Sequence, residues 1–196
     1  MRNTVFADRS FTGVLRAGIT AIALGALSAC GGGGGGNNPT QVNGTAKSVI
    51  NGQIQASRDF IVNNLETGEQ VADGTTDSTG QYEFEFLGTN LVMVVVFPPE
   101  QDTGEPRTSG LVFLSESTNT KDLEDFTDIA CVAGSQAVGD NSITAQQLSA
   151  QRIANLEAAA QQYLASNVVD FTNTDSFNAA VAAVRQSTND GANAPS

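Results

Sequence analysis

The sequence predicts an α+β fold, in which an antiparallel β-sandwich of about seven strands in residues 44–115 precedes about three helices in residues 116–189. Two observations support this prediction. Up to residue 115, short runs of apolar or alternating residues are separated by turn-forming Gly, Asn, Asp and Pro, as in antiparallel sandwiches. Beyond residue 115, apolar residues recur every three or four positions, which is the spacing of one helix face.

Residues 1–29 have the features of a secretory signal peptide. Arg2, Arg9 and Arg16 precede the uncharged run from Ala17 to Leu27. Its eleven residues would rise only about 16 Å as a helix, whereas a hydrocarbon core is roughly 30 Å thick. The run therefore predicts a cleaved leader and not a membrane-spanning helix.

The leader ends in Leu27-Ser28-Ala29-Cys30, which resembles the lipobox of bacterial lipoproteins. The resemblance implies that the Cys30 thiol receives diacylglycerol, that cleavage occurs before Cys30, and that the new amine is acylated, for example with palmitate. Two or three chains are needed for lasting attachment, because one chain binds marginally at about 0.8 kcal/mol per buried CH₂. The alternative is an ordinary leader that happens to end near a cysteine.

Residues 30–43 are expected to form a tether between this anchor and the folded part. The segment contains the glycine run 31–36 and cannot pack a core, so it should behave as a coil with a root-mean-square span of roughly 20 Å. Gly31, and not Asp, follows the cysteine. By resemblance to sorting in Gram-negative bacteria, this implies the outer membrane, with the leaflet left open.

The charge balance limits the classes of partner. Removing the leader's three arginines and one aspartate from the chain's 9 basic and 21 acidic residues leaves 6 and 20, a net charge of −14. Such a surface repels phosphates, so nucleic acid is not expected as a partner. The acidity either favours cationic partners or serves solubility alone.

The residue inventory offers little for catalysis or for a cofactor. The chain has no His, which removes the commonest general base and metal ligand. If Cys30 carries lipid, Cys131 has no disulfide partner within the chain, and its apolar neighbours favour a small core residue over a reactive thiol. We therefore predict no catalytic residues, no metal and no cofactor.

Two segments give the clearest strand patterns. In Tyr82–Phe86, three aromatic residues alternate with Glu83 and Glu85, which places the rings on one face and the carboxylates on the other. Leu91–Phe97 is apolar throughout, as expected for a central strand. A further strand is expected over 45–50, leading into a hairpin turn at 51–52.

The sequences of residues 66–72, 76–84 and 91–96 resemble the carboxypeptidase regulatory-like domain: a variable segment, a T-D-x-x-G-x-Y-x-F run, then a valine-rich strand. The resemblance covers about residues 42–114 and implies a transthyretin-like sandwich. That family's sandwich has no catalytic residues of its own and serves as a stabilising, scaffolding or binding module. The family's usual Gly-Ala-x-Val entry is replaced here by Gly52-Gln53-Ile54-Gln55.

The C-terminal region predicts three helices. The first has a stripe beginning at Leu123 and is ended by Gly139; the second is expected to start at a Thr144–Gln147 capping box and to run to about Ser166. The third should be capped by Thr172 or Thr174 and stop at 189–191, leaving residues 190–196 as a disordered tail.

The apolar stripes of these helices are narrow and alanine-rich, so the helices cannot be stable alone. They should pack on one another or on an open face of the sandwich. Alternatively, the stripe awaits a partner chain.

Three constellations could carry chemistry. Glu83 and Glu85 could serve glycoside hydrolysis, although both point from one strand face. Residues 77–80 and 100–105 could offer oxygens to Ca²⁺ without the spacing of a known calcium loop. Ser–Lys catalysis would have to use Lys47 or Lys121.

Together these features predict a non-enzymatic lipoprotein, anchored to the outer membrane through Cys30, that acts as a binding or scaffolding module at the cell envelope. The expected partners are the membrane, through the lipid, and an envelope protein or glycan. A carbohydrate-binding accessory module is the alternative, although the chain has no Trp and two Tyr. An envelope hydrolase is a third reading.

Overall fold

The computed structural model describes residues 39–86, 91–98, 106–114 and 118–192. These form seven strands: β1 (Thr40–Thr45), β2 (Asp59–Asn64), β3 (Gln70–Thr75), β4 (Gln81–Phe86), β5 (Leu91–Val96), β6 (Thr108–Phe113) and β7 (Thr118–Thr120). They also form three α-helices and a 3-10 helix: α1 (Asp125–Gly139), η1 (Ala145–Gln147), α2 (Ala150–Ser166) and α3 (Thr174–Ala192). The predicted α+β fold is confirmed. None of the described helices has the length and apolar character needed to cross a membrane.

The strands form two facing sheets, with orders β4-β1-β7 and β3-β2-β5-β6. All pairs are antiparallel except β1 with β7. Tyr82 and Phe84 are buried between the sheets, while Glu83 and Glu85 are exposed on the outer face of β4. The alternation predicted for β4 is therefore confirmed.

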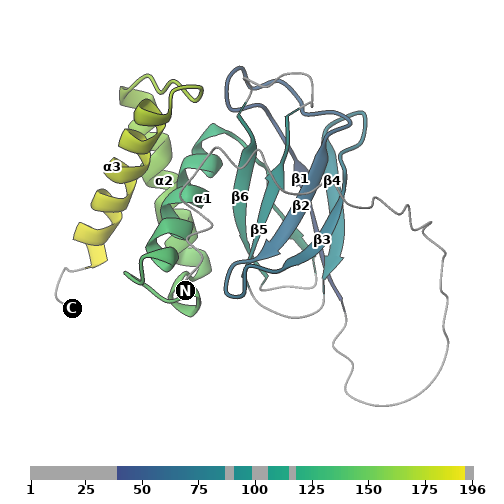
Figure 1. The fold of residues 1–196 in the computed structure, drawn as a ribbon, viewed down its shortest axis with the longest axis horizontal. Helices are drawn as coiled ribbons and strands as arrows, with labels where there is room; N and C mark the ends of the chain where they lie inside the picture. The colour runs from purple at the N-terminus through teal and green to yellow at the C-terminus, as the bar shows by residue number, and fades with distance from the viewer. Residues whose placement is uncertain (1–38, 87–90, 99–105, 115–117, 193–196) are drawn as a thin grey trace, which may run out of the picture.

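The helices add a third layer to the sandwich. In Figure 1, α1 lies beside β6, and α2 and α3 cover the side of α1 that faces away from the sheet. On β5, Val92, Val94 and Val96 belong to the core between the sheets. The alternate residues Leu91 and Met93 belong to the core shared with the helices. β5 is apolar throughout because both of its faces are covered.

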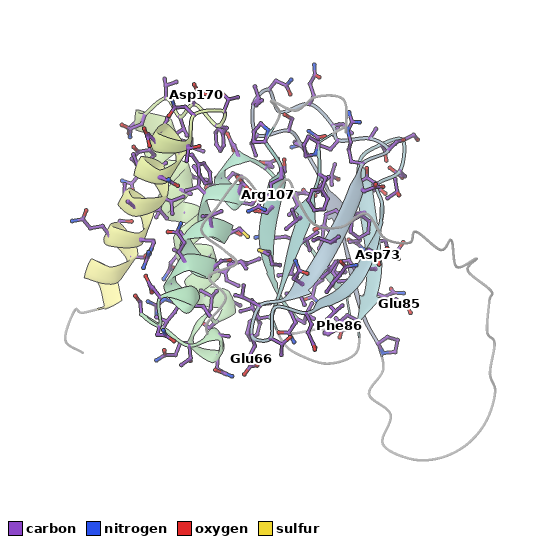
Figure 2. The ribbon with its side chains drawn as sticks, viewed as in Figure 1. Glu66, Asp73, Glu85, Phe86, Arg107 and Asp170 are labelled. Carbon is purple, nitrogen blue, oxygen red and sulfur yellow. The ribbon has the colours of Figure 1, made fainter. Side chains whose placement is uncertain are left out.

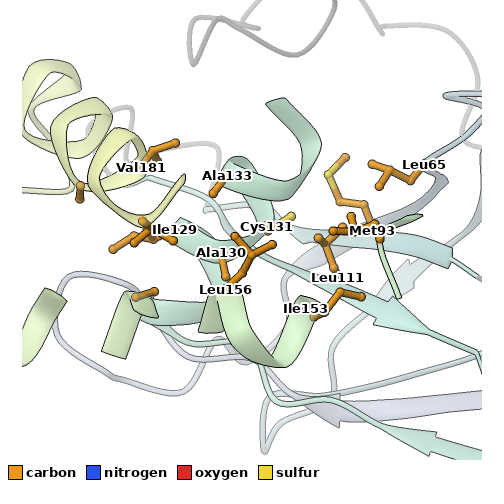
Figure 3. Close-up of a cluster of buried hydrophobic side chains, with 14 of the residues drawn as sticks. Leu65, Met93, Leu111, Ile129, Ala130, Cys131, Ala133, Ile153, Leu156 and Val181 are labelled. Carbon is orange, nitrogen blue, oxygen red and sulfur yellow. The ribbon is translucent and has the colours of Figure 1, made fainter. Parts of the chain in front are cut away.

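The core between sheet and helices is the larger of the two buried clusters (Figure 3). Leu111 of β6 and Ile129 of α1 are 2% and 0% exposed in it, and full burial of such a side chain stabilises the fold by about 1.5–3 kcal/mol. A Cβ atom on Gly134 of α1 would lie 2.8 Å from Leu111 Cδ1, so glycine allows this close packing. The predicted helical stripe is thus covered within its own chain.

Several predicted boundaries differ from the structure. β1 begins at Thr40, inside the range 30–43 assigned to the tether, and β7 lies inside the range 116–189 assigned to helices. The strand expected over 45–50 is wrong, because the β1 ladder with β4 ends at Thr45. The 51–52 turn does form, with Gly52 at φ +66°, but its flanks meet only through an isolated bridge between Lys47 and Ile54.

The start of the first helix was also predicted too early. Leu123 precedes α1 and continues the pairing along β1: its N–H donates to the Thr45 carbonyl at 2.8 Å, and its carbonyl accepts from the Lys47 N–H at 2.9 Å. Its side chain is fully buried in the core between the sheets. The helical spacing of Leu123 was therefore coincidental.

The expected capping box at Thr144 and Gln147 is present, but it opens η1 and not α2. α2 starts five residues later than expected, with Ser149 as its N-cap accepting from the Arg152 N–H at 3.3 Å. Neither proposed threonine caps α3. Asn173 Oδ1 accepts from the Ser176 N–H at 3.0 Å instead.

α3 continues to Ala192, so residues 190–192, which were assigned to the tail, are helical. Residues 193–196 lie outside the described part of the chain.

Candidate binding surfaces

The outer face of the β4-β1-β7 sheet is polar and acidic. Gln41 pairs with Glu85 and Asn43 with Glu83, and Gln41 Nε2 donates to Glu85 Oε1 at 3.2 Å. None of the seven described strands contains Lys or Arg. Figure 2 shows Glu85 and Asp73 on the side of the sandwich away from the helices.

The two glutamates of this face do not form a glycosidase pair. Glycoside hydrolysis needs two carboxyl groups flanking the bond that breaks. Glu83 and Glu85 instead project side by side from one strand into solvent. The two carboxylates are therefore not arranged for this chemistry.

The Asp77 loop uses its carboxylate within the turn. Asp77 Oδ1 accepts from the Thr79 N–H at 2.7 Å, the Thr79 hydroxyl at 2.8 Å and the Gln81 N–H at 2.9 Å. These hydrogen bonds, the one from Gln81 above all, lower the pKa of the carboxyl. No group of three potential metal-ligating His, Cys, Asp or Glu side chains occurs among the described residues. The other suggested calcium loop, 100–105, lies outside the described residues.

Cys131 is a buried core residue, as predicted, and it forms no disulfide. Burial raises the pKa of its thiol to about 12. Next to it in the core, the Ser109 hydroxyl donates to Asp128 Oδ1 at 2.6 Å. A thiol that is protonated and shielded from solvent is not a nucleophile. Cys30 and the preceding Leu27-Ser28-Ala29 lie outside the described residues.

Both lysines considered for Ser–Lys catalysis are held in ion pairs. Lys47 pairs with Glu124, and Lys121 pairs with Glu157 of α2. The hydrogen bond to Glu124 raises the pKa of Lys47. A catalytic lysine must instead lose its proton readily, which the raised pKa of Lys47 disfavours. The two ion pairs link the sandwich to the start of α1 and to α2.

Sequence reasoning missed a groove along α2 and the end of α3. It has a volume of about 630 Å³. Its walls are amide and hydroxyl side chains, one arginine and two alanines: Gln147, Ser149, Gln151, Arg152, Asn155, Ala158, Ala159, Gln162, Ser187 and Thr188. The sequence signal that could have indicated the groove was the series of Gln and Asn residues on the polar face of the second helix.

Arg152 differs from Lys47, Lys121 and Arg185, which are each paired with a carboxylate. Arg185 of α3, for comparison, binds Asp140 Oδ2 at 2.5 Å and so fastens α3 to the end of α1. No hydrogen bond or ion pair joins the Arg152 guanidinium to another described residue. The groove therefore contains a positive charge that the described fold does not neutralise.

Comparison with known proteins adds only distant structural similarity. No family model matches the sequence, and no curated protein is similar to it. The TIE protein of Bacillus anthracis is 18% identical over 44% of this chain and 16% of its own length, with a TM-score of 0.33. A candidate carbohydrate-binding protein of Pseudomonas aeruginosa is 16% identical over 44% of this chain and 88% of its own, with a TM-score of 0.32.

The 5-hydroxyisourate hydrolase of Klebsiella pneumoniae is 12% identical over 43% of this chain and 88% of its own, with a TM-score of 0.33. Similarities this distant carry no argument about what this chain binds. The functional argument rests on its own residues.

Proposed function

We propose that this chain is a lipid-anchored, non-enzymatic binding or scaffolding module of the bacterial cell envelope. The observation that carries the proposal is the Leu27-Ser28-Ala29-Cys30 motif, which directly follows an apolar run and lies ten positions before β1 begins at Thr40. The whole described fold therefore follows the cysteine. The ten residues from Cys30 to Pro39 include the glycine run 31–36.

The strand that follows the proposed anchor, β1, has two distinct ends in the small sheet. At one end of the sheet Thr40 pairs with Phe86, and at the other Thr45 pairs with Gln81. The loop that carries Ile50 and Ile54 lies at the second end, where the Gln55 N–H donates to the Ala46 carbonyl at 2.9 Å. The anchored end and this loop are therefore at opposite ends of β1.

Ile50 and Ile54 of this loop are 50% and 47% exposed, whereas none of the large apolar residues in the described strands is exposed. Because β1 begins at Thr40, ten residues after Cys30, this loop lies at the end of β1 that is farther along the chain from the proposed anchor. Gly31 after the cysteine supports the outer membrane as the site of anchoring.

Metabolic labelling tests the anchor. A Gram-negative host expressing the full chain is grown with labelled palmitate, and the purified protein is analysed by mass spectrometry. Label is expected on the peptide that begins with Cys30, and it should be lost in Cys30→Ser. Cys131→Ala is the matched control because it also removes a thiol, and it should keep the label. An unmodified Cys30 in the wild-type chain would refute the anchor.

A carbohydrate-binding module is the second candidate function, and the amide-lined groove on α2 favours it. A pull-down from native envelope with the full chain distinguishes the two candidates. A specific protein retained by the wild type supports scaffolding, whereas retained glycan supports the second candidate. Turnover of an envelope polymer by the purified protein would contradict the non-enzymatic assignment.

A further inference from the structure

We propose that the groove between α2 and the end of α3 binds an acidic saccharide, whose carboxylate is held by Arg152. The inference rests on the proposed binding function and specifies the chemical class of its ligand. It is independent of the lipid anchor.

The first argument is charge. The mature chain has 6 basic and 20 acidic residues. Lys47, Lys121 and Arg185 are each paired with a carboxylate, whereas Arg58, Arg107 and Arg152 form no ion pair with a described residue, and of these three only Arg152 lines the groove. The groove residues include no Asp or Glu, so Arg152 supplies the charge of its lining. A guanidinium binds a carboxylate through two parallel N–H···O bonds, which gives both affinity and orientation.

The second argument is the hydrogen-bonding character of the walls. Gln151 Nε2 donates to Asn155 Oδ1 at 3.0 Å, which leaves the Gln151 carbonyl and the Asn155 amino group free to bind a ligand. The Ser187 and Thr188 hydroxyls both donate to the Val184 carbonyl, at 2.8 and 3.1 Å. Their oxygens can therefore accept from a ligand. This mixture of donors and acceptors matches sugar hydroxyls.

The third argument is shape. Ala158 and Ala159 contribute small apolar surface to the groove, against which the C–H face of a sugar ring can lie. The volume of about 630 Å³ is within the range of small-molecule sites, roughly 300–1,000 Å³. A neutral sugar would leave the charge of Arg152 uncompensated, and a small anion such as phosphate would leave most of the groove unfilled.

The helix that carries most of the groove is held against the core. Ile153, Leu156 and Ala160 are buried on the inner face of α2, which fixes the helix against the core. Glu157 binds Lys121 beyond β7 and further restrains α2. A ligand would therefore meet preformed walls and would order little of the chain on binding.

The test uses isothermal titration calorimetry with the full mature chain, residues 30–196. The probes are trisaccharides of glucuronic and galacturonic acid, the matching neutral trisaccharides, and inorganic phosphate. Binding of a uronic trisaccharide at least tenfold tighter than that of its neutral counterpart is expected. Absence of measurable binding by either uronic probe at 10 mM, or binding no tighter than that of phosphate, would overturn the proposal.

Variants locate the site. Arg152→Gln should weaken uronic binding at least tenfold and bring it close to neutral-sugar binding. Arg58→Gln is the matched control, because it makes the same charge change at a residue that does not line the groove. Arg58 bonds to Gln55 in the sandwich, and this variant should bind as the wild type does. Ala158→Trp places a bulky side chain in the groove from an exposed position and should abolish binding without unfolding.

Equal loss of affinity in Arg58→Gln and Arg152→Gln would mean that overall charge, and not the groove, is responsible. Failure of the saccharide titrations in a chain that still carries lipid on Cys30 and captures an envelope protein would refute the groove proposal alone.

Discussion

Gly44 of β1 marks the closest approach between the small sheet and the chain that follows β7. A Cβ atom at this position would lie 2.6 Å from the Lys121 carbonyl carbon and 2.8 Å from Tyr82 Oη, with the Lys121 carbonyl oxygen closer still. Two of these three atoms are backbone and cannot rotate away. The Tyr82 hydroxyl donates to the Lys121 carbonyl, and the Lys121 N–H donates to the Asn43 carbonyl at 2.8 Å. We therefore expect Gly44→Ala to push the 121–123 segment off β1.

The expected cost of Gly44→Ala has two parts. Overpacking of a well-packed site costs about 1–3 kcal/mol. Weakening the two hydrogen bonds of Lys121 adds about 0.5–1.5 kcal/mol each. A loss of about 3 kcal/mol in the free energy of unfolding is a conservative total, and for a domain of this size it lowers Tm by roughly 6–12 °C.

Thermal and urea unfolding, followed by circular dichroism, measure this loss. Gly139→Ala is the matched control, because Gly139 ends α1 and nothing lies within 4 Å of its Cβ position. That variant should change stability by less than about 1 kcal/mol. If Gly44→Ala lowers Tm no more than the control does, the placement of residues 121–123 against β1 is wrong.

Three further predictions concern the core and the titrating groups. Leu111→Ala removes a side chain packed between β6 and α1 and should lower the unfolding free energy by about 2–5 kcal/mol, whereas a loss below 1 kcal/mol would contradict the shared core. The Ser142 hydroxyl, and then Arg185, lower the pKa of Asp140 below the ordinary value of 3.8 for this carboxyl. The carboxylate therefore stabilises the fold above that pH, and the contribution is lost as pH falls through the lowered pKa. The stability difference between wild type and Asp140→Asn, measured from pH 6 to 2, should therefore shrink below about pH 4, and a constant difference would exclude the effect. Native Cys131 should resist iodoacetamide at pH 8 and react once the chain is unfolded in guanidinium, and rapid native alkylation would show that the thiol is accessible.

Local patterns determined much of the secondary structure. The period-two alternation of residues 82–86 decided which side of β4 is buried, because successive side chains of a strand point to opposite faces. The turn at Gly139–Asn141 ended α1 where its sequence predicts, since Asn141 adopts a left-handed backbone with φ 62°. The Leu27–Cys30 motif is likewise local, and the proposed leader and anchor rest on it without reference to any fold.

Long-range pairing decided the features that local patterns could not. Leu123 has helical spacing but lies in the sandwich core, because β1 offers it a backbone partner at Thr45. The candidate binding groove could not be predicted for the same reason. Whether Arg152 has a carboxylate beside it depends on where α3 and the sheets place their acidic residues. Periodicity specifies which face of a helix or strand is buried. Which other elements that face contacts, and which charged side chains remain unpaired, are decided only when distant segments of the chain pack together.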